Sequence, residues 1–231
     1  MDWTACTGPA GLLTERLQLA PVSETDEAEL FALHSDPRAF AEDSTEPLTD
    51  PAQMRWMLAQ WRESWARHGL GHLTVRAQQD PAGDGGADLP VGLLGVVGLV
   101  PLSGGEGDQP PVLSAYWRLS PAATGLGIAT EAMRAVLEAL PAGARRGPHA
   151  AGSDTGTHDG RALDDATALD DSTAQDDRTV PFEIVAITDR GNTASLALAA
   201  RLGFRPAPPD RPVPGGRADD VLLLLDPSAT A

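Results

Sequence analysis

Lysine is absent from this chain of 231 residues, and cysteine occurs once, at Cys6. The absence of lysine excludes a P-loop, because that motif ends in Gly-Lys-Ser/Thr and uses the lysine to hold phosphates. A single cysteine excludes an internal disulfide bond and a zinc site built from cysteines. Apolar runs of membrane-spanning length are missing, and Asp2-Trp3 is not the basic start of a signal peptide. The expected location is therefore cytoplasmic.

Basic residues are scarce compared with acidic ones: 17 arginines stand against 33 aspartates and glutamates, which gives a net charge of −16. This balance argues against binding to nucleic acid, whose phosphates require a basic protein face. It argues equally against binding to an anionic membrane surface. A cationic partner, such as an amine or a basic peptide, would suit the charge, although solubility is the simpler explanation of the overall excess.

Apolar periodicity and punctuating residues predict alternating strands and helices. Start and stop signals are clearest for one helix, where Asp50 precedes Pro51 and Gly69 follows the apolar stripe. Ser23 and Asp26 supply a capping signal for an earlier helix, and Asn192 caps a later one. The expected elements are strand 12–22, a helix ending near 36, helix 51–69, strand 70–78, strand 91–102, strand 112–119, helix 128–140, strand 180–188, a helix between 192 and 203, and strand 221–225.

An aspartate-rich segment, residues 142–178, interrupts this pattern. Alanine, threonine, glycine and serine separate its acids, and large apolar side chains are almost missing. Such a segment buries too little apolar surface to offset the entropy of ordering. We therefore predict a disordered acidic insertion, solvated rather than partner-binding, within one domain that spans residues 12–226. Residues 1–11 and 227–231 are expected to be loose termini.

The most informative stretch is the strand 112–119, the glycine-containing turn 120–127 and the helix that begins at Ile128. A glycine turn that leads into a helix points backbone N–H groups and the positive helix end at an anion. A dinucleotide-binding fingerprint matches poorly, because Gly125 and Gly127 are followed by Thr130 where a third small residue is expected. A tight connection without a ligand is the plain alternative for this turn taken alone.

The same stretch resembles the acetyl-CoA-binding segment of the GNAT superfamily of N-acetyltransferases. The order Tyr116-Trp117, Ser120-Pro121, Thr124-Gly-Leu-Gly127-Ile-Ala129 and Thr-Glu-Ala is similar to the branch that acetylates the N-termini of ribosomal proteins. A second similarity lies downstream, where Asn192-x-x-Ser195 leads to Leu-Gly203-Phe204. The resemblance implies an α/β (α+β) fold of GNAT type, in which helices flank a mixed, largely antiparallel central sheet. Its central strands, 112–119 and 180–188 here, would part to form a CoA cleft.

The resemblance also implies a set of cofactor-binding residues for acetyl-CoA. The pantetheine arm would lie along the first parted strand, and the pyrophosphate would bind N–H groups of the turn, where glycine permits close approach. Ser195 and Asn192 would lie on the other side of the cofactor, near the thioester. The implied cofactor-binding residues are Trp117, Arg118, Leu119, Thr124, Gly125, Leu126, Gly127, Ile128, Ala129, Asn192 and Ser195.

Two residues are predicted to be catalytic. Ser195 would hydrogen-bond the leaving thiolate, with a serine bonded to its own helix backbone as the open alternative. Tyr116 is the second, and the candidates for the general base are Glu42, Glu46 and Tyr116 itself. A backbone N–H in strand 112–119 would hold the oxyanion. The resemblance implies that the helical region 51–69 forms one wall of the substrate groove, which makes Trp56, Trp61 and Trp65 candidates for substrate contact, although an apolar stripe is more often core.

The chain departs from the family pattern at three places. Ala199 stands where many members carry a tyrosine, Leu113, Ser114 and Ala115 stand where a glutamate is common, and Thr124 replaces the usual first residue of the turn motif. The predicted function is transfer of an acetyl group from acetyl-CoA to a primary amine, either a protein N-terminus or a small molecule. A non-catalytic CoA-binding or interaction module is the alternative, and a nucleotide-binding α/β protein is a weaker one.

Two further expectations concern metals and assembly. His68 and His72 have a metal-like spacing, but the glycines between them break the helix that would align their rings, so no metal is expected. The chain is expected to be a monomer or a homodimer.

Overall fold

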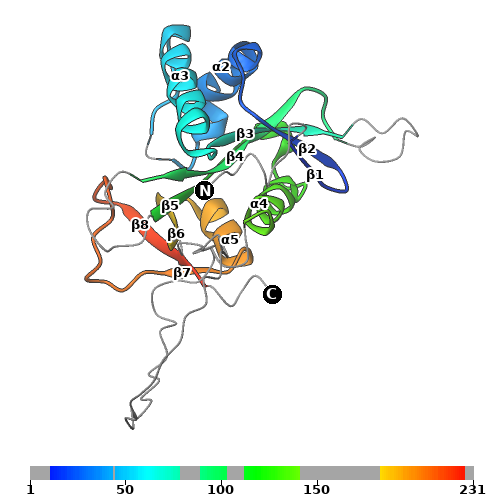
Figure 1. Cartoon of the computed structure of the whole chain (residues 1–231). Helices are drawn as coiled ribbons and strands as arrows, with labels where there is room; N and C mark the ends of the chain where they lie inside the picture. Colours follow the sequence, from blue (N-terminus) through cyan, green and yellow to red (C-terminus); the bar gives the residue numbers. More distant parts are fainter. Residues whose placement is uncertain (1–10, 44, 79–88, 103–111, 141–182, 227–231) are drawn as a thin grey trace, which may run out of the picture.

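The computed structural model describes residues 11–43, 45–78, 89–102, 112–140 and 183–226. In this part of the chain eight strands form one sheet in the order β1-β2-β3-β4-β5-β6-β8-β7, with helices on both faces (Figure 1). The strands are β1 (Leu12–Leu13), β2 (Leu17–Pro21), β3 (His72–Ala77), β4 (Leu93–Pro101), β5 (Val112–Leu119), β6 (Glu183–Asp189), β7 (Phe204–Pro206) and β8 (Asp220–Leu225). The α-helices are α2 (Glu27–Ser35), α3 (Pro51–His68), α4 (Ile128–Glu138) and α5 (Thr193–Arg201), with short 3₁₀ turns η1 (Glu24–Asp26), η2 (Pro37–Phe40) and η3 (Pro121–Ala123).

The sheet has one parallel pair. Strands β5 and β6 run parallel, and every other neighbouring pair is antiparallel. Parallel neighbours need a crossover connection, and α4 lies in the stretch of chain between β5 and β6. The sheet is thus mixed but largely antiparallel, as the sequence predicted.

Figure 1 shows α2 and α3 on one side of the sheet and α4 and α5 on the other. The larger core lies under α4 and α5, where Met133 and Leu137 are fully buried against strand residues such as Val97. A second core lies under α2 and α3, where Met54 and Leu30 are fully buried. Two cores separated by one sheet make β5 a strand whose alternate side chains meet different environments.

The start and stop of α3 follow the sequence closely. Asp50 accepts a hydrogen bond from the N–H of Ala52 at 2.8 Å, and Gly69 ends the helix in the left-handed region at φ 61°. The stripe predicted from spacing buries Met54, Leu58 and Trp61. Trp56, set to one side of that stripe, is 66% exposed.

Some boundaries differ from the expectation. The strand expected over 12–22 is a hairpin of two strands, because the chain turns at residues 14–16. The short strand β7, which follows α5 at once and pairs with β8, was not predicted. The helix expected over 128–140 ends at Glu138. These are shifts at element ends, except for β7, which adds an edge strand.

Several predictions fall on residues outside the described ranges. The acidic insertion 142–178, most of the terminus 1–11 and the terminus 227–231 are among them, so their expected looseness stays a prediction. Within the described ranges, none of the helices combines the length and the apolar character needed to cross a membrane.

Candidate active site: a cleft at the parting of two strands

The parallel strands β5 and β6 pair over only part of their length. Their ladder joins Val112–Ala115 to Glu183–Ala186. Beyond it, β6 continues to Asp189 with β8 as its partner, and β5 continues to Leu119 with β4 as its partner. The edge of β5 that faces β6 therefore has no ladder partner from residue 116 to residue 119 in the described chain, as the predicted parting of the central strands requires.

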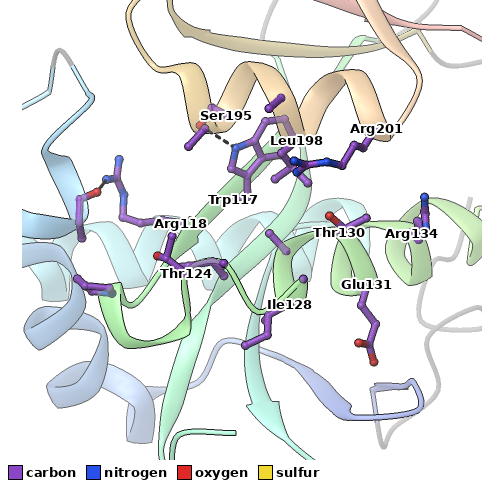
Figure 2. A pocket seen from close by; sticks show the side chains of 18 of the residues that line it. Trp117, Arg118, Thr124, Ile128, Thr130, Glu131, Arg134, Ser195, Leu198 and Arg201 are labelled. Atoms are coloured by element: carbon purple, nitrogen blue, oxygen red, sulfur yellow. Dashed lines mark hydrogen bonds between the residues drawn. The ribbon is translucent and has the colours of Figure 1, made fainter.

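A cleft of about 1160 Å³ opens at this parting. Its walls come from the β1–β2 hairpin, from residues 38–43, from the end of β5 with the following turn, and from α4 and α5. Figure 2 shows the side chains of α4 and α5 that face this space. The cleft thus gathers segments that are far apart in the chain around the turn singled out by sequence.

The turn has backbone N–H groups for which the described chain provides no acceptor. Gly125 and Gly127 have φ values of 81° and 77°, a region that other residues adopt only with strain. Gly127 is the N-cap of α4 and provides no side-chain cap, so the first N–H groups of this helix have no acceptor within it. A Cβ built on Gly125 would meet no atom within 4 Å outside its chain neighbours. Packing therefore does not require glycine there; its positive φ favours glycine, and the space beside the backbone is open.

A salt bridge fastens the hairpin to this turn. Glu131 in α4 accepts hydrogen bonds from Arg16 Nε at 2.8 Å, from the Arg16 N–H at 3.0 Å and from Thr14 Oγ1 at 2.5 Å. Arg16 also donates to the Leu126 carbonyl oxygen at 3.2 Å. Burial would raise the pKa of Glu131, but the hydrogen bonds from Thr14 and Arg16 outweigh it and hold the pKa below its usual value. The carboxylate therefore stays charged and fixes the turn.

Ser195 and Asn192 lie on the opposite wall, as predicted. Asn192 Oδ1 accepts from the N–H of Ser195 at 2.8 Å and so caps α5. Trp117 reaches across from β5 and donates its indole N–H to Ser195 Oγ at 3.1 Å (Figure 2). Of the predicted cofactor-binding residues, all but Leu126 line the cleft: Trp117, Arg118, Leu119, Thr124, Gly125, Gly127, Ile128, Ala129, Asn192 and Ser195.

Tyr116, the other predicted catalytic residue, is not brought to Ser195. Neighbouring residues of a strand point to opposite faces, and Tyr116 points toward α2 and α3, where its ring lies edge-on to His72 at 4.8 Å. Its hydroxyl contacts His34 Nε2 at 3.2 Å. Desolvation raises the pKa of the Tyr116 phenol. Because successive side chains of a strand point to opposite faces, the sequence alone could have shown that Tyr116 and Trp117 do not face the same side of the sheet.

The hydrogen bonds around Tyr116 form a chain with one direction. Burial lowers the pKa of His34 to about 4, so its ring is neutral near pH 7. Its Nδ1 lies 2.8 Å from the Leu30 carbonyl oxygen, which can only accept, so Nδ1 carries the proton and Nε2 accepts from Tyr116. Arg118 Nε donates to the Tyr116 oxygen at 3.3 Å. The phenol proton is thus directed away from the cleft and toward His34.

Arg118 also holds one wall of the cleft in place. It donates to the Ala39 carbonyl oxygen and to Asp43 Oδ2, each at 2.7 Å, and its guanidinium lies 3.7 Å from the centre of the Phe40 ring. Residues 39–43 are therefore clamped to the end of β5. Sequence reasoning missed this clamp, because its partners lie 75 or more positions apart in the chain.

The clamped segment brings a carboxylate to the first turn of α5. Glu42 Oε2 accepts from Thr193 Oγ1 at 3.1 Å and from the Ala194 N–H at 3.2 Å. Its other oxygen, Oε1, has no partner among the described residues. Both Glu42 and Glu46, the other glutamate proposed as a base, are exposed, but Glu46 does not line the cleft. Of the two, only Glu42 lines the cleft and contacts the two residues that precede Ser195.

Charged side chains of both signs line the cleft. Arg134 on α4 and Arg201 on α5 line it, and in the described chain neither has an ion-pair partner. Figure 2 shows both at the end of the cleft away from Arg118. The carboxylate of Glu42 lies at the Ser195 end. Two arginines without an ion-pair partner in the described chain could hold phosphates, and the Glu42 oxygen without a described partner could meet an amine.

The histidine pair considered for metal binding is separated by the fold. His68 is the last residue of α3, whereas His72 is buried in β3, where its ring stacks on Trp61 at a centroid distance of 3.9 Å. The described residues contain no group of three or more side chains suited to hold a metal ion.

The chain is similar to known proteins in sequence and in fold. Residues 16–205 match the family described as acetyltransferase (GNAT) domain. No curated protein sequence matches the chain. Solved structures share the fold: a Bordetella pertussis protein assigned to the GNAT-family acetyltransferases is 24% identical, covers 93% of this chain and 98% of its own, and has a TM-score of 0.56.

Two further structures contain coenzyme A. RimL, a ribosomal L7/L12 α-N-protein acetyltransferase in complex with coenzyme A, is 15% identical, with coverage of 92% of this chain and 94% of its own and a TM-score of 0.56. Spermidine N-acetyltransferase from Vibrio cholerae, in complex with CoA and spermine, is 13% identical, with coverage of 91% and 95% and a TM-score of 0.54. At these identities the similarity concerns the fold.

Proposed function

Since this chain belongs to the GNAT acetyltransferases, we propose that it transfers the acetyl group of acetyl-CoA to a primary amine by direct attack in a ternary complex. The observation that carries the proposal is the cleft at the parting of β5 and β6, which combines a free strand edge with the glycine turn. A free strand edge supports an extended, amide-containing chain, and the turn supports a pyrophosphate.

The residues present fit coenzyme A on observations that do not depend on the family. The position next to Gly125 is open where a Cβ would otherwise stand, which suits phosphate oxygens close to the backbone. Arg134 and Arg201 line the cleft wall, have no ion-pair partner among the described residues, and would hold further phosphate charge. Trp117, Arg118 and Leu119 supply the edge along which the pantetheine amides would lie.

The reaction requires a neutral amine and a place for charge to develop. The amine nitrogen attacks the thioester carbonyl carbon, the carbonyl oxygen becomes an oxyanion, and the carbon–sulfur bond then breaks with its electron pair on sulfur. A backbone N–H of β5 beyond residue 115 would stabilise the oxyanion. Ser195 would hydrogen-bond the departing sulfur. The amine proton finally reaches the thiolate, and the products are an amide and CoA-SH.

Glu42 is the residue we assign as general base. Its Oε1 is free while Oε2 is held by Thr193 and Ala194, so the carboxylate is positioned and still has an oxygen for a proton. Tyr116 is unsuited to this role, because its hydroxyl proton is directed to His34. Glu46 is unsuited because it does not line the cleft.

The acceptors of two structural neighbours suggest two classes of amine, a protein N-terminus and a polyamine. RimL acts on the N-terminus of a ribosomal protein, and the Vibrio cholerae enzyme is a spermidine acetyltransferase. Both are amines that are cationic before they lose a proton. The acidic excess of the present chain and the carboxylate of Glu42 support an acceptor of this kind, either a peptide N-terminus or a polyamine.

A second candidate function is binding of acyl-CoA without catalysis. It is favoured by two departures from the pattern that the resemblance implies: Ala199 stands where many family members carry a tyrosine, and Leu113, Ser114 and Ala115 stand where a glutamate is common. Ala199 and Leu113 are each 1% exposed. Neither position can supply an acid or a base.

The test is release of free thiol from acetyl-CoA by the full-length protein. The acceptor panel consists of peptides with different N-terminal residues, spermidine and spermine. Turnover with any acceptor supports the acetyltransferase. Micromolar binding of acetyl-CoA without turnover on the whole panel supports the non-catalytic module, and absence of binding rejects both functions.

A further inference from the structure

The contact between Trp117 and Ser195 constrains where the serine proton can point. An indole N–H can only donate a hydrogen bond. The distance of 3.1 Å from Trp117 Nε1 to Ser195 Oγ therefore makes Oγ the acceptor. The serine hydroxyl proton must lie in another direction from the same oxygen.

Among the described residues, Ser195 has no acceptor for that proton. Its own N–H is held by Asn192, and its hydroxyl donates to no other group in the described chain. Many serines in helices donate to a backbone carbonyl of the preceding turn, which was the open alternative at the level of sequence. Here the hydroxyl lines the cleft, with its proton uncommitted.

Trp117 is itself held firmly. Its backbone belongs to β5, where it pairs with Val97 of β4, and its ring lies edge-on to Phe204 with centroids 6.3 Å apart. Phe204 is buried in the core. A fixed donor on a hydroxyl oxygen restricts the directions open to the hydroxyl proton, and it also makes that hydroxyl a stronger donor to its own partner.

We propose that Trp117 is a positioning residue that directs the hydroxyl proton of Ser195 at the leaving sulfur of acetyl-CoA. This inference rests on the proposed function. As the carbon–sulfur bond breaks, its electron pair moves to sulfur and the Ser195 O–H donates to the developing thiolate. The serine keeps its proton. The proton lost by the amine, taken by Glu42, is the one that completes CoA-SH, so the step is balanced without another reactant.

The experiment is a double-mutant cycle with Trp117→Phe, Ser195→Ala and the double variant. Phenylalanine keeps an aromatic ring beside Phe204 and removes the indole donor together with part of the ring volume. We expect Ser195→Ala to lower kcat about 30-fold and Trp117→Phe about tenfold. The double variant should be no slower than Ser195→Ala alone, because the indole acts only through the serine. The KM for acetyl-CoA should stay within about twofold throughout.

Trp65→Phe is the matched control. Trp65 also donates its indole N–H, to the His72 carbonyl oxygen at 2.8 Å. It lies on α3 and is not among the residues that line the cleft, so the structure does not support the substrate contact predicted for it. The Trp65→Phe variant should keep the wild-type kcat, and Ser195→Ala should lower kcat equally in the wild-type and Trp65→Phe backgrounds, whatever the effect of Trp65→Phe on thermal stability. Binding of acetyl-CoA and melting temperature are measured for every variant to confirm folding.

The outcomes separate the inference from the function on which it rests. If wild type turns over and the losses of Trp117→Phe and Ser195→Ala multiply in the double variant, the positioning role is rejected and the acetyltransferase stands. A Trp117→Phe variant with wild-type kcat rejects it as well. If wild type releases no thiol with any acceptor, both the inference and the proposed function fail.

Discussion

Polar side chains on the two faces of β5 differ in whether all their hydrogen bonds are made within the protein. On the face toward α5, Trp117 donates to Ser195 and leaves the serine proton without a protein acceptor at the cleft. On the face toward α2, Tyr116 lies inside a closed chain that runs from Arg118 to the Leu30 carbonyl oxygen. Trp117 thus contacts a hydroxyl that is able to act on a ligand, whereas its neighbour Tyr116 belongs to the contacts that hold residues 39–43 in place.

The hydrogen bonds that each side chain makes indicate its role. A side chain whose hydrogen bonds are all made inside the protein is costly to disturb and suits positioning. A side chain with one uncommitted donor or acceptor facing a cleft suits binding or catalysis. Ser195 and Glu42 have such a free atom. Tyr116 does not.

The largest effect is expected at Glu42. Glu42→Gln keeps an oxygen for the hydrogen bonds from Thr193 and Ala194 but cannot take a proton. We expect kcat to fall about 100-fold, with little change in acetyl-CoA binding. Glu46→Gln, four residues away in the same segment, should retain full activity. Steady-state thiol release checks both, and a Glu42→Gln enzyme within twofold of wild type would remove Glu42 as the base.

The next effect is a dependence of the free energy of unfolding on pH, caused by the histidines buried between the sheet and helices α2 and α3. Burial lowers the pKa of His72 to about 3, and the nearby His34 adds to this effect. Between that pKa and the ordinary value near 6.5 the unfolded chain binds a proton that the folded chain does not, so stability falls as pH drops below about 6.5. Each such histidine adds a slope of up to about 1.4 kcal/mol per pH unit.

His72→Phe tests this slope. Phenylalanine keeps a ring to stack on Trp61 and removes a nitrogen, Nδ1, that is buried without a partner. Urea unfolding between pH 4.5 and pH 7 should show a free energy of unfolding that depends less on pH than in wild type, by about one proton. His68→Gln, at an exposed position, is the control. An unchanged slope in His72→Phe would show that the imidazole is not buried as described.

The smallest effect is expected at Tyr116. Tyr116→Phe removes the hydroxyl that links His34 to Arg118 and should lower stability by about 1–2 kcal/mol. The KM for the acceptor amine should rise a few fold, because Arg118 clamps residues 39–43. The kcat and its pH profile should stay near wild type. A loss of 100-fold or more in kcat at unchanged KM would instead make Tyr116 a proton-transferring group and erase the contrast between the faces.

Sequence reasoning succeeded where the signal is local. The caps Asp50 and Asn192, the stop at Gly69 and the bounds of β5 all rest on windows of a few residues. The motif around Gly127 and the one around Asn192 led to the family and to the cleft. Local caps and turns carry their own hydrogen-bond chemistry, so they can be read without knowing the fold.

The missing parts depend on contacts between distant residues. Arg16 and Glu131 are 115 positions apart, and Trp117 and Ser195 are 78 apart. No local pattern links them, because their pairing exists only once the sheet has formed. Strand β7 was missed for another reason: its three residues include Pro206 and carry too little periodicity to be recognised. The catalytic assignment of Tyr116 considered its residue type and not the face of the strand on which it lies.

The most direct test of the account measures acetyl-CoA binding by calorimetry to wild type, Gly125→Glu and Gly215→Glu. Both glycines have positive φ, and a Cβ on either meets no neighbouring atom within 4 Å, so the backbone cost of substitution is similar. Only Gly125 faces the cleft. The account predicts that Gly125→Glu weakens binding at least about 100-fold, through steric overlap and charge repulsion with the pyrophosphate, whereas Gly215→Glu binds as wild type does. Equal affinities in all three proteins would contradict the placement of coenzyme A on this turn.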